Sequence, residues 1–450
     1  MNANSFLSRR TFLRLAGLAT AGIAITACVP AAQPDAAASA GGVAPPSEQV
    51  TVRWQDWPDW EPNMDKLTAL LKESLPGIAV EFEPLSDGFE DKTLTMMVAG
   101  TAPDVMTAWG PVFRKWSEKG QLLDLQPNVE VTFSEEQLSD FHPWQWNGMV
   151  AKDSGIRFAM PYYVNVIMLL YNKAHFDEAG AEYPTGEMDH IDYAEMLKQM
   201  SKQEGDQVAH WGGVVVAWIY DRFQFHVQAF GGHVANPDDW TECWLDQPEA
   251  QEALEWMRAR MWDDNSIAQP LQLGERSDSQ LFTAGLASTL EGGMGNIAFY
   301  AREAQFEFAM THLPKGPARR ATLGTTDGWG IYKGTPQPDA SWELMKVLVG
   351  DDLQNLMIET WGGVPNRLSL VPSWKEKTIS SFPVLENANL DAVLDALNEG
   401  YPMLTEEFKN HAESQQLIDA ALQKVYQVGD TPVSYFAEVA LQVTELNRAA

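Results

Sequence analysis

The sequence has little cysteine and little positive charge. Its only cysteines, Cys28 and Cys243, can form at most one bridge, so a disulfide framework is excluded as the scaffold. Lysine and arginine total 31 against 62 aspartates and glutamates, which gives a formal net charge of −31 at pH 7. So acidic a chain repels a phosphate backbone, and we expect no nucleic-acid partner.

Long hydrophobic runs are also missing. The apolar run over residues 15–27 is too short for a mature transmembrane helix, which needs ~20 residues, and fits the core of a signal peptide. No other run approaches ~18 residues, so we expect the rest of the chain not to span a membrane.

The features around this run are typical of an exported lipoprotein. Arg9 and Arg10 precede it and resemble a twin-arginine signal, and Ile25-Thr26-Ala27-Cys28 resembles a lipobox. We expect a signal peptide over residues 1–27, a lipid anchor at Cys28 and a flexible Ala/Pro/Gly/Ser-rich tether over residues 28–47. In the alternative, the arginines cap an N-terminal helix and Cys28 is a buried thiol.

The common catalytic motifs are absent from the sequence as well. It contains no GxGxxG after a strand, no P-loop, no CxxC and no HExxH. His226 and His233 are the nearest approach to a metal-binding pair, and we assign them to core or surface. We therefore expect no cofactor, no metal and no enzyme activity. A secreted glycosidase with a carboxylate pair stays open as the alternative, because such a pair needs only two acids ~5–10 Å apart.

What is present indicates a folded chain of at least two domains. The composition is 45% hydrophobic with 17 tryptophans, and 450 residues exceed the size of one hydrophobic core. Residues 49–55, 77–85 and 104–109 are predicted strands, and residues 65–74 and 91–99 are predicted helices between them. This alternation predicts an α/β fold with a mainly parallel sheet.

The alternation continues toward the C-terminus, where helices dominate. The patterns predict strands at 157–172, 211–217, 286–291, 306–313 and 328–333, and helices at 191–203, 248–263, 339–349, 351–360, 390–398, 406–428 and 432–446. We find no internal repeat.

Several segments, in order, resemble the extracellular solute-binding proteins of ABC importers, in particular the carbohydrate-binding group related to maltose- and trehalose-binding proteins. The segments are Ala99-Gly100-Thr101-Ala102-Pro103-Asp104-Val105, Tyr171-Asn172-Lys173 with Phe176, Phe282-Thr283-Ala284-Gly285, and Gly328-Trp329-Gly330. The resemblance covers most of the chain after the tether. It departs from the family pattern at residues 184–192 and 288–290, which weakens any transfer of ligand identity.

The resemblance implies a two-lobed periplasmic-binding-protein-like fold with discontinuous lobes and a helix-rich C-terminal third. Lobe one would span 48–163 plus 331–361 and lobe two 165–327 plus 365–450, with crossings near 163–166, 326–330 and 362–366. It implies a carbohydrate ligand between the lobes, an ABC transporter membrane permease as partner, and a monomer. The protein would lie on the outer face of the cell membrane or in the periplasm, touching the membrane only through its lipid.

A sugar site needs aromatic plates for C–H faces and polar groups for hydroxyls. Trp57, beside Asp56, follows the first strand, and Trp109 ends the third, where α/β folds bind ligands. Trp54 is assigned to the core. By resemblance, the crossings supply Tyr163, Asn165, Trp329 and Arg367, and a glycine-rich turn supplies Glu291 and Met294. Trp218 is a weaker candidate, and Trp361 is assigned to hinge packing.

Overall fold

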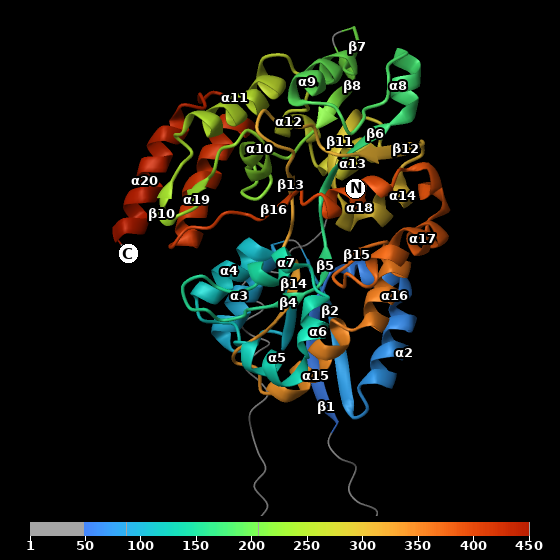
Figure 1. Cartoon of the computed structure of the whole chain (residues 1–450), viewed down its shortest axis with the longest axis vertical. Helices are drawn as coiled ribbons and strands as arrows, with labels where there is room; N and C mark the ends of the chain where they lie inside the picture. The colour runs from blue at the N-terminus through green and yellow to red at the C-terminus, as the bar shows by residue number, and fades with distance from the viewer. Residues whose placement is uncertain (1–48, 87, 206, 450) are drawn as a thin grey trace, which may run out of the picture. The chain divides into compact units, whose positions relative to one another are not determined.

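The computed structural model describes residues 49–86, 88–205 and 207–449, and Gln49–Ala450 form one compact unit (Figure 1). The expected signal peptide, the tether and Cys28 lie outside the described residues. No helix in the described ranges has both the length and the apolar character needed to cross a membrane.

The first sheet has five strands in the order β2 (Ile78–Pro84), β1 (Val50–Asp56), β3 (Val105–Ala108), β14 (Gly328–Ile331) and β4 (Met160–Pro161). Strand β1 alternates as its sequence predicts up to Trp54: Val52 and Trp54 are fully buried, while Arg53 is partly exposed and pairs with Glu83 at 2.6 Å. At its C-terminal end the alternation stops, because Gln55 and Asp56 are buried as well. Strands β2 and β3 run parallel to β1, but β14 is antiparallel to both β3 and β4.

Helices surround this sheet. They are η1 (Pro58–Asn63), α2 (Met64–Ser74), α3 (Phe89–Ala99), α4 (Gly110–Glu118), α5 (Gln126–Thr132), α6 (Glu135–Ser139), α7 (Pro143–Gly148), α15 (Pro338–Leu348) and α16 (Asp351–Trp361). As predicted, α3 ends at Gly100, whose φ of 75° suits a residue without a Cβ.

The second sheet has the order β12 (Phe308–Thr311), β6 (Ile167–Asn172), β11 (Ala287–Gly293), β8 (Gln207–Val214) and β7 (Lys202–Glu204). Only β11 and β8 are parallel, and the other three pairings are antiparallel. The prediction of a mainly parallel sheet is therefore wrong for this half, because β6 and β12 enter the sheet from segments whose direction no local pattern reveals.

The remaining helices are α8 (Lys173–Ala179), α9 (His190–Gln199), α10 (Gln224–Ala229), α11 (Pro248–Trp262), α12 (Pro270–Leu273), α13 (Asp278–Thr283), η2 (Met294–Asn296), α14 (Ile297–Glu303), α17 (Val371–Ser381), η3 (Pro383–Asn387), α18 (Asp391–Asn398), α19 (His411–Leu422), the π-helical η4 (Gln423–Val428) and α20 (Tyr435–Ala449). Among them, α17 packs against α16. Two-stranded pairs join β9 (Ala235–Asn236) to β10 (Asp239–Cys243) and β13 (Thr322–Leu323) to β16 (Pro402–Met403).

Some predicted boundaries were wrong. The helix predicted for 191–203 ends at Gln199, because residues 202–204 pair with β8 instead. The helix predicted for 406–428 begins only at His411. Four helices over residues 110–148 were not predicted at all. Helices α5, α6 and α7 are only five to seven residues long, whereas α4 was overlooked although its apolar residues Val112, Phe113 and Trp116 have helical spacing.

The three predicted crossings contain segments that pair with one another or adjoin such pairs. Strand β5 (Tyr163–Val164) is antiparallel to β15 (Val364–Pro365), and Val166 bridges Gly324 just before the expected second crossing. One buried cluster contains side chains from both sheets, including Trp54 and Leu290, so packing is continuous through this region. The lobe boundaries themselves stay a prediction.

Candidate ligand-binding site

The ends of several strands meet around a cavity of about 320 Å³, here called the inner cavity. Trp57 follows β1, Trp109 follows β3, Gly293 ends β11, and Asp327 precedes β14. The full lining is Trp57, Asp59, Trp109, Tyr163, Asn165, Ile219, Asp221, Arg222, Gly293, Gly295, Asn296, Thr325, Asp327 and Trp361. Both sheets and the segments between them contribute, as expected where α/β sheets bind ligands.

Aromatic rings form one part of this lining. The rings of Trp57 and Trp109 stack with centroids 6.0 Å apart and an interplanar angle of 17°, and Phe89 meets each edge-on at 5.6 Å. Tyr163 packs edge-on against Trp361 at 4.8 Å. These contacts hold the rings in place without closing the cavity, so flat apolar surface is ready for a ligand.

Hydrogen-bonding groups form the other part. Asp327 accepts hydrogen bonds from the Tyr163 hydroxyl at 3.2 Å and from the Thr325 hydroxyl. Burial raises the pKa of Asp327 to about 6, although both bonds favour its ionised form. Asn165 Oδ1 accepts from the Gly295 amide at 3.0 Å, and no described residue accepts from its amide nitrogen. The site thus presents donors and acceptors beside aromatic faces.

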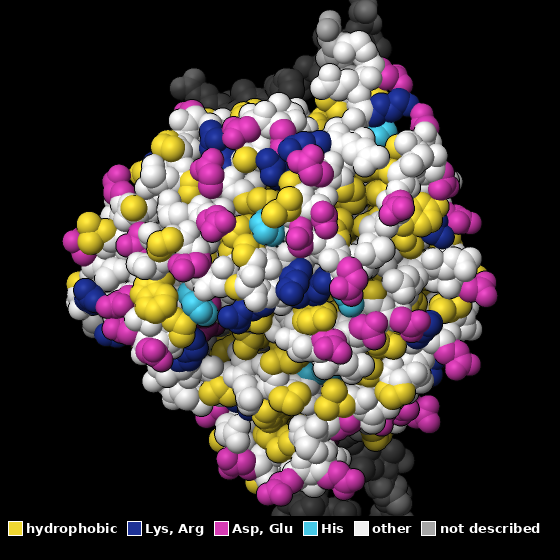
Figure 2. All heavy atoms as spheres, turned by 45° about the horizontal axis from the view of Figure 1, so that its top comes forward, with side chains coloured by type: hydrophobic (Ala, Val, Ile, Leu, Met, Phe, Trp, Pro, Cys, Tyr) yellow, Lys and Arg dark blue, Asp and Glu magenta, His cyan; other side chains and the backbone are white. Residues whose placement is uncertain are grey.

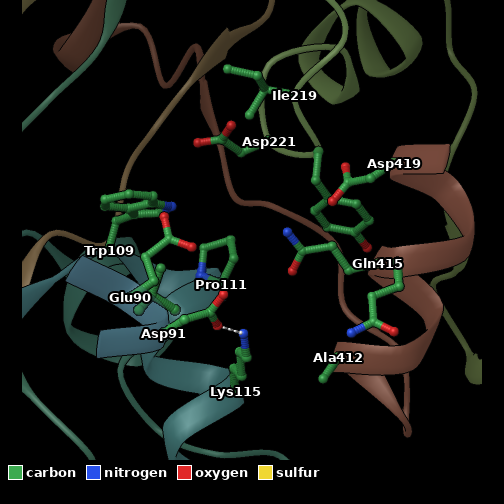
Figure 3. A pocket seen from close by; sticks show the side chains of 13 residues that line it. Glu90, Asp91, Trp109, Pro111, Lys115, Ile219, Asp221, Ala412, Gln415 and Asp419 are labelled. Carbon is green, nitrogen blue, oxygen red and sulfur yellow. Dashed lines mark hydrogen bonds and ion pairs between the residues drawn. The ribbon is translucent and has the colours of Figure 1, made fainter. Parts of the chain in front are cut away.

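A second cavity of about 390 Å³, here called the outer cavity, adjoins the first (Figure 3). The two share Trp109, Ile219 and Asp221 as lining residues. The outer cavity is otherwise lined by Glu90, Asp91, Pro111, Val112, Lys115, Tyr220, Ala412, Gln415, Gln416 and Asp419. Space for a ligand therefore extends from Trp361 past Trp109 to helix α19.

The structure brings four of the predicted site residues together: Trp57, Trp109, Tyr163 and Asn165 line the inner cavity. Their contact with a ligand stays a prediction.

Three further predicted residues lie next to these but are fully buried: Asp56, Met294 and Trp329. The Trp329 ring stacks on Tyr162 with centroids 3.9 Å apart, and its nitrogen donates to Asp56 at 2.7 Å. Stacking on a sugar requires an exposed ring face, and Trp329 has none here. The prediction treated the second crossing as a cleft wall, whereas β14 is an interior strand with both faces covered.

The remaining predicted residues lie elsewhere. Glu291 is buried, and its carboxylate accepts a hydrogen bond from the Tyr193 hydroxyl at 3.3 Å. The other carboxylate oxygen lies 2.8 Å from His226 Nε2. The Arg367 guanidinium covers the Phe141 ring at 4.0 Å and donates to two backbone carbonyls. Trp218 packs against the apolar cores. None of the three lines the inner or the outer cavity.

Sequence reasoning did not single out the other lining residues of the inner cavity, among them Asp59, Asp221, Arg222, Asp327 and Trp361. Asp59 and Asp327 are close in sequence to the predicted Trp57 and Trp329, so their proximity was a usable signal. Trp361, assigned above to hinge packing, does pack there but also lines the cavity. Asp221 and Arg222 lie in the turn after β8, three and four residues beyond the predicted Trp218, but sequence reasoning singled out neither of them.

Among the described residues, no cluster of three or more His, Cys, Asp or Glu side chains could hold a metal ion. His226 lies against Glu291, and His233 Nδ1 lies 2.7 Å from Glu406, so each imidazole has a carboxylate neighbour. The groups of the inner cavity that can contact a ligand are aromatic rings, carboxylates, amides and the guanidinium of Arg222.

Solved structures with the same fold cover almost the whole described chain. An ABC substrate-binding protein from Listeria monocytogenes, in complex with cycloalternan, is 20% identical with a TM-score of 0.78, covering 89% of this chain and 99% of that one. Maltose-bound MalE3 of T. maritima is 20% identical with a TM-score of 0.71 and the same coverage. UgpB from Mycobacterium tuberculosis, in complex with glycerophosphocholine, is 16% identical with a TM-score of 0.71, covering 89% and 98%.

These similarities confirm the α/β, two-lobed, periplasmic-binding-protein-like fold. No curated relative matches the chain. The bacterial extracellular solute-binding protein family matches residues 66–382, well over half of the sequence. The chain is therefore a member of the bacterial extracellular solute-binding protein family.

Proposed function

We propose that this protein captures a carbohydrate in the inner cavity and delivers it to an ABC transporter permease. The observation that carries the proposal is the pairing of the stacked Trp57 and Trp109 rings with Tyr163, Asn165 and Asp327 around one cavity. Sugars present apolar C–H faces and a rim of hydroxyls that both donate and accept, and this lining offers a complement to each. Cycloalternan and maltose in two neighbours of the same fold also support a carbohydrate.

The work of such a protein is closure around its ligand. Residues from both sheets line the inner cavity. A ligand that contacts residues from both sheets therefore stabilises the closed conformation, in which the two sets of residues lie close together. The closed, loaded form would then dock on the permease as a monomer. This mechanism needs no catalytic group, metal or cofactor.

Export and anchoring belong to the same proposal. The twin arginine and the lipobox would send the chain across the membrane and attach it through Cys28 to the outer face of the cell membrane or to the periplasmic side. A Cys28→Ser variant tests this step. We expect the natural chain in the membrane fraction and the variant in the soluble fraction after cell fractionation, whereas equal partition of both would contradict the anchor.

A thermal-shift screen of mono-, di- and oligosaccharides tests ligand capture. We expect at least one sugar to raise the melting temperature and to reduce the radius of gyration in solution scattering, with the sugar recovered intact. Trp109→Ala should reduce the affinity for that sugar by tenfold or more, because it removes a wall common to both cavities. Trp244→Ala is the matched control, since Trp244 is also half-buried but lines neither cavity.

Two results would contradict the proposal. If no sugar shifts the melting temperature, carbohydrate capture is wrong. If a sugar is hydrolysed during the assay, the glycosidase alternative is supported instead, and the acids around the inner cavity become the groups to test.

A further inference from the structure

Helix α4, which follows strand β3 of the first sheet, meets the start of helix α19 beside the outer cavity. Glu118, the last residue of α4, accepts hydrogen bonds from the backbone amides of His411 at 3.1 Å and Ala412 at 3.4 Å. A carboxylate in this position serves the first amides of α19, which have no carbonyl partner within the helix. Figure 3 shows Lys115 of α4 and Ala412 of α19 on facing sides of the outer cavity, so the contact borders the proposed ligand space.

Arg114, one turn before Glu118, extends this contact into the interior. Its guanidinium is fully buried, with Glu118 at 3.3 Å on its own helix and Glu407 at 3.9 Å on the segment before α19. It also lies over the ring of Trp240 on β10, 5.5 Å from the ring centroid. A cation carried by α4 is therefore enclosed by a carboxylate and an aromatic ring from other parts of the chain.

The segment that receives Arg114 is anchored to the elements around the second sheet. Tyr220, in the turn after β8, donates from its hydroxyl to the carbonyl of Glu406 at 2.9 Å, and the Glu406 amide donates to the Gln224 side chain at 2.8 Å. In Figure 1, α4 and α19 lie to the left of the paired strands β5 and β15. The contact thus joins the first-sheet half and the second-sheet half of the molecule at a place separate from that pairing.

Electrostatic repulsion between the two halves opposes the contact. The net charge is −31, and acidic side chains are spread across the face shown in Figure 2. A charge of this size disfavours a compact arrangement through self-repulsion. Burial raises the pKa of Glu118 and of Glu407, whereas the Arg114 charge favours the ionised form of both. Arg114 therefore supplies positive charge where the two halves bring buried carboxylates together.

The contact does not satisfy all of its polar groups. Arg114 Nε and Nη2 are buried without a hydrogen-bond acceptor among the described residues, and neither ring nitrogen of His411 has a partner there. Buried donors without acceptors cost free energy, and separation of the halves would expose them to water. The contact therefore stabilises the closed form only in part, which leaves the equilibrium between open and closed forms responsive to a ligand.

We propose that this contact is a latch that holds the two halves together over the outer cavity before a ligand binds. Its members are Arg114, Glu118, Trp240 and Glu407. The inference rests on the proposed function, because it concerns the regulation of closure around the ligand. By raising the population of the closed form, the latch increases the affinity for the ligand and slows its release.

The first test needs no ligand. Glu118→Gln and Glu407→Gln each remove one carboxylate partner of Arg114, and both are made in the Cys28→Ser protein, which carries no lipid. We expect each to increase the radius of gyration of the ligand-free protein in solution scattering, because the buried guanidinium loses a counter-charge and is hydrated when the halves separate. Circular dichroism shows whether each variant folds, and either variant alone is sufficient for the test.

Glu413→Gln is the matched control for these substitutions. Glu413 lies in the first turn of α19, and its pair with Lys119 at 3.7 Å spans the same contact. Both side chains of this pair are about half exposed, and an exposed ion pair contributes little. The control removes the same charge, and we expect the radius of gyration to stay unchanged.

The second test uses the sugar identified by the thermal-shift screen. We expect Glu118→Gln and Glu407→Gln to weaken its binding by about fivefold or more in isothermal titration calorimetry and to speed its release, while Glu413→Gln stays within about twofold. Neither Glu118 nor Glu407 lines the inner or the outer cavity. A loss of affinity would therefore come from the conformational equilibrium and not from a lost contact with the sugar.

The outcomes separate this inference from the proposed function. Unchanged radii in both folded variants would overturn the latch, and carbohydrate capture would stand if a sugar still binds. Larger radii with unchanged affinity would overturn the effect of the latch on binding. Larger radii in both variants with no sugar bound by the parent protein would support the latch and overturn carbohydrate capture, whereas unchanged radii with no sugar bound would overturn both.

Discussion

Trp329 donates its indole N–H to the buried carboxylate of Asp56, with 2.7 Å between Nε1 and Oδ2, although 273 positions separate the two residues. Asp56 also accepts from the backbone amide of Trp57 at 2.7 Å. Burial nevertheless raises the pKa of Asp56 to about 8. The bond joins the end of β1 to β14 directly beneath the inner cavity, so it fixes the strand ends that carry Trp57 and Asp327.

Replacing Trp329 should therefore reduce stability before it affects binding. Trp329→Ala creates a large cavity in the core and should lower the unfolding free energy by about 3–5 kcal/mol. Trp329→Phe keeps most of the ring but removes the N–H donor, and should cost about 1–3 kcal/mol. Urea denaturation of the ligand-free protein measures both. Unchanged stability of Trp329→Ala combined with lost sugar binding would instead place Trp329 in the ligand site.

Asp327 should make stability depend on pH. Its pKa is raised from its ordinary value of 3.8 to about 6, so the folded protein binds this proton more tightly than the unfolded chain does. The contribution of Asp327 to the unfolding free energy should thus fall by about 3 kcal/mol as pH rises from about 4 to about 6. Above pH 6 this contribution should stay low.

The measurement compares natural protein and Asp327→Asn by urea denaturation between pH 4 and pH 8. Groups distant from Asp327 titrate equally in both proteins, so the difference reports Asp327 together with its electrostatic neighbours Asp221 and Arg222. A difference that is constant with pH would contradict the raised pKa.

Arg114 should be more sensitive to substitution than any surface cation. It is fully buried on α4, where it pairs with Asp153 at 2.8 Å and Glu118 at 3.3 Å, and Glu407 lies at 3.9 Å. Arg114→Met leaves three carboxylates without their common cation and should cost about 3–5 kcal/mol. Lys375→Met removes half of an exposed pair with Asp391 and should cost about 0–1 kcal/mol. Similar losses for the two variants in thermal or urea unfolding would disprove this ranking.

Gly212 should not tolerate even a methyl group. A Cβ at this position on β8 would lie 1.8 Å from the backbone carbonyl oxygen of Leu197 at the end of α9. Gly212→Ala must push helix and sheet apart and should cost about 1–3 kcal/mol or more. At Gly186 the nearest atom is in the His312 side chain at 3.3 Å, so Gly186→Ala should be milder. Comparable melting temperatures for the two variants would refute the close approach.

Local patterns were sufficient for the elements that stabilise themselves locally. The alternation in residues 49–55 predicted a strand that the structure has as β1 (Val50–Asp56), and glycine at position 100 predicted the end of α3. The segments that resemble the family then indicated the fold, because they occur in the family's order along the chain and lie at turns and strand ends. Trp57 and Trp109 could be predicted as cavity residues since each follows a strand, and strand ends converge in α/β folds.

Tertiary structure decided everything that depends on partners distant in sequence. The direction of β14 between β3 and β4 is one such outcome, and the burial of Trp329 against Tyr162 follows from it. The meeting of Glu90, Asp221 and Asp419 is another, because the three residues lie on α3, in the turn after β8 and on α19 and share no sequence motif. The sequence by itself was sufficient for the main strands of the two sheets, for the family and for the presence of tryptophans after β1 and β3. Only the packing of distant segments determined which rings face the cavity and where buried negative charge accumulates, since exposure and electrostatic interaction are properties of three-dimensional neighbours.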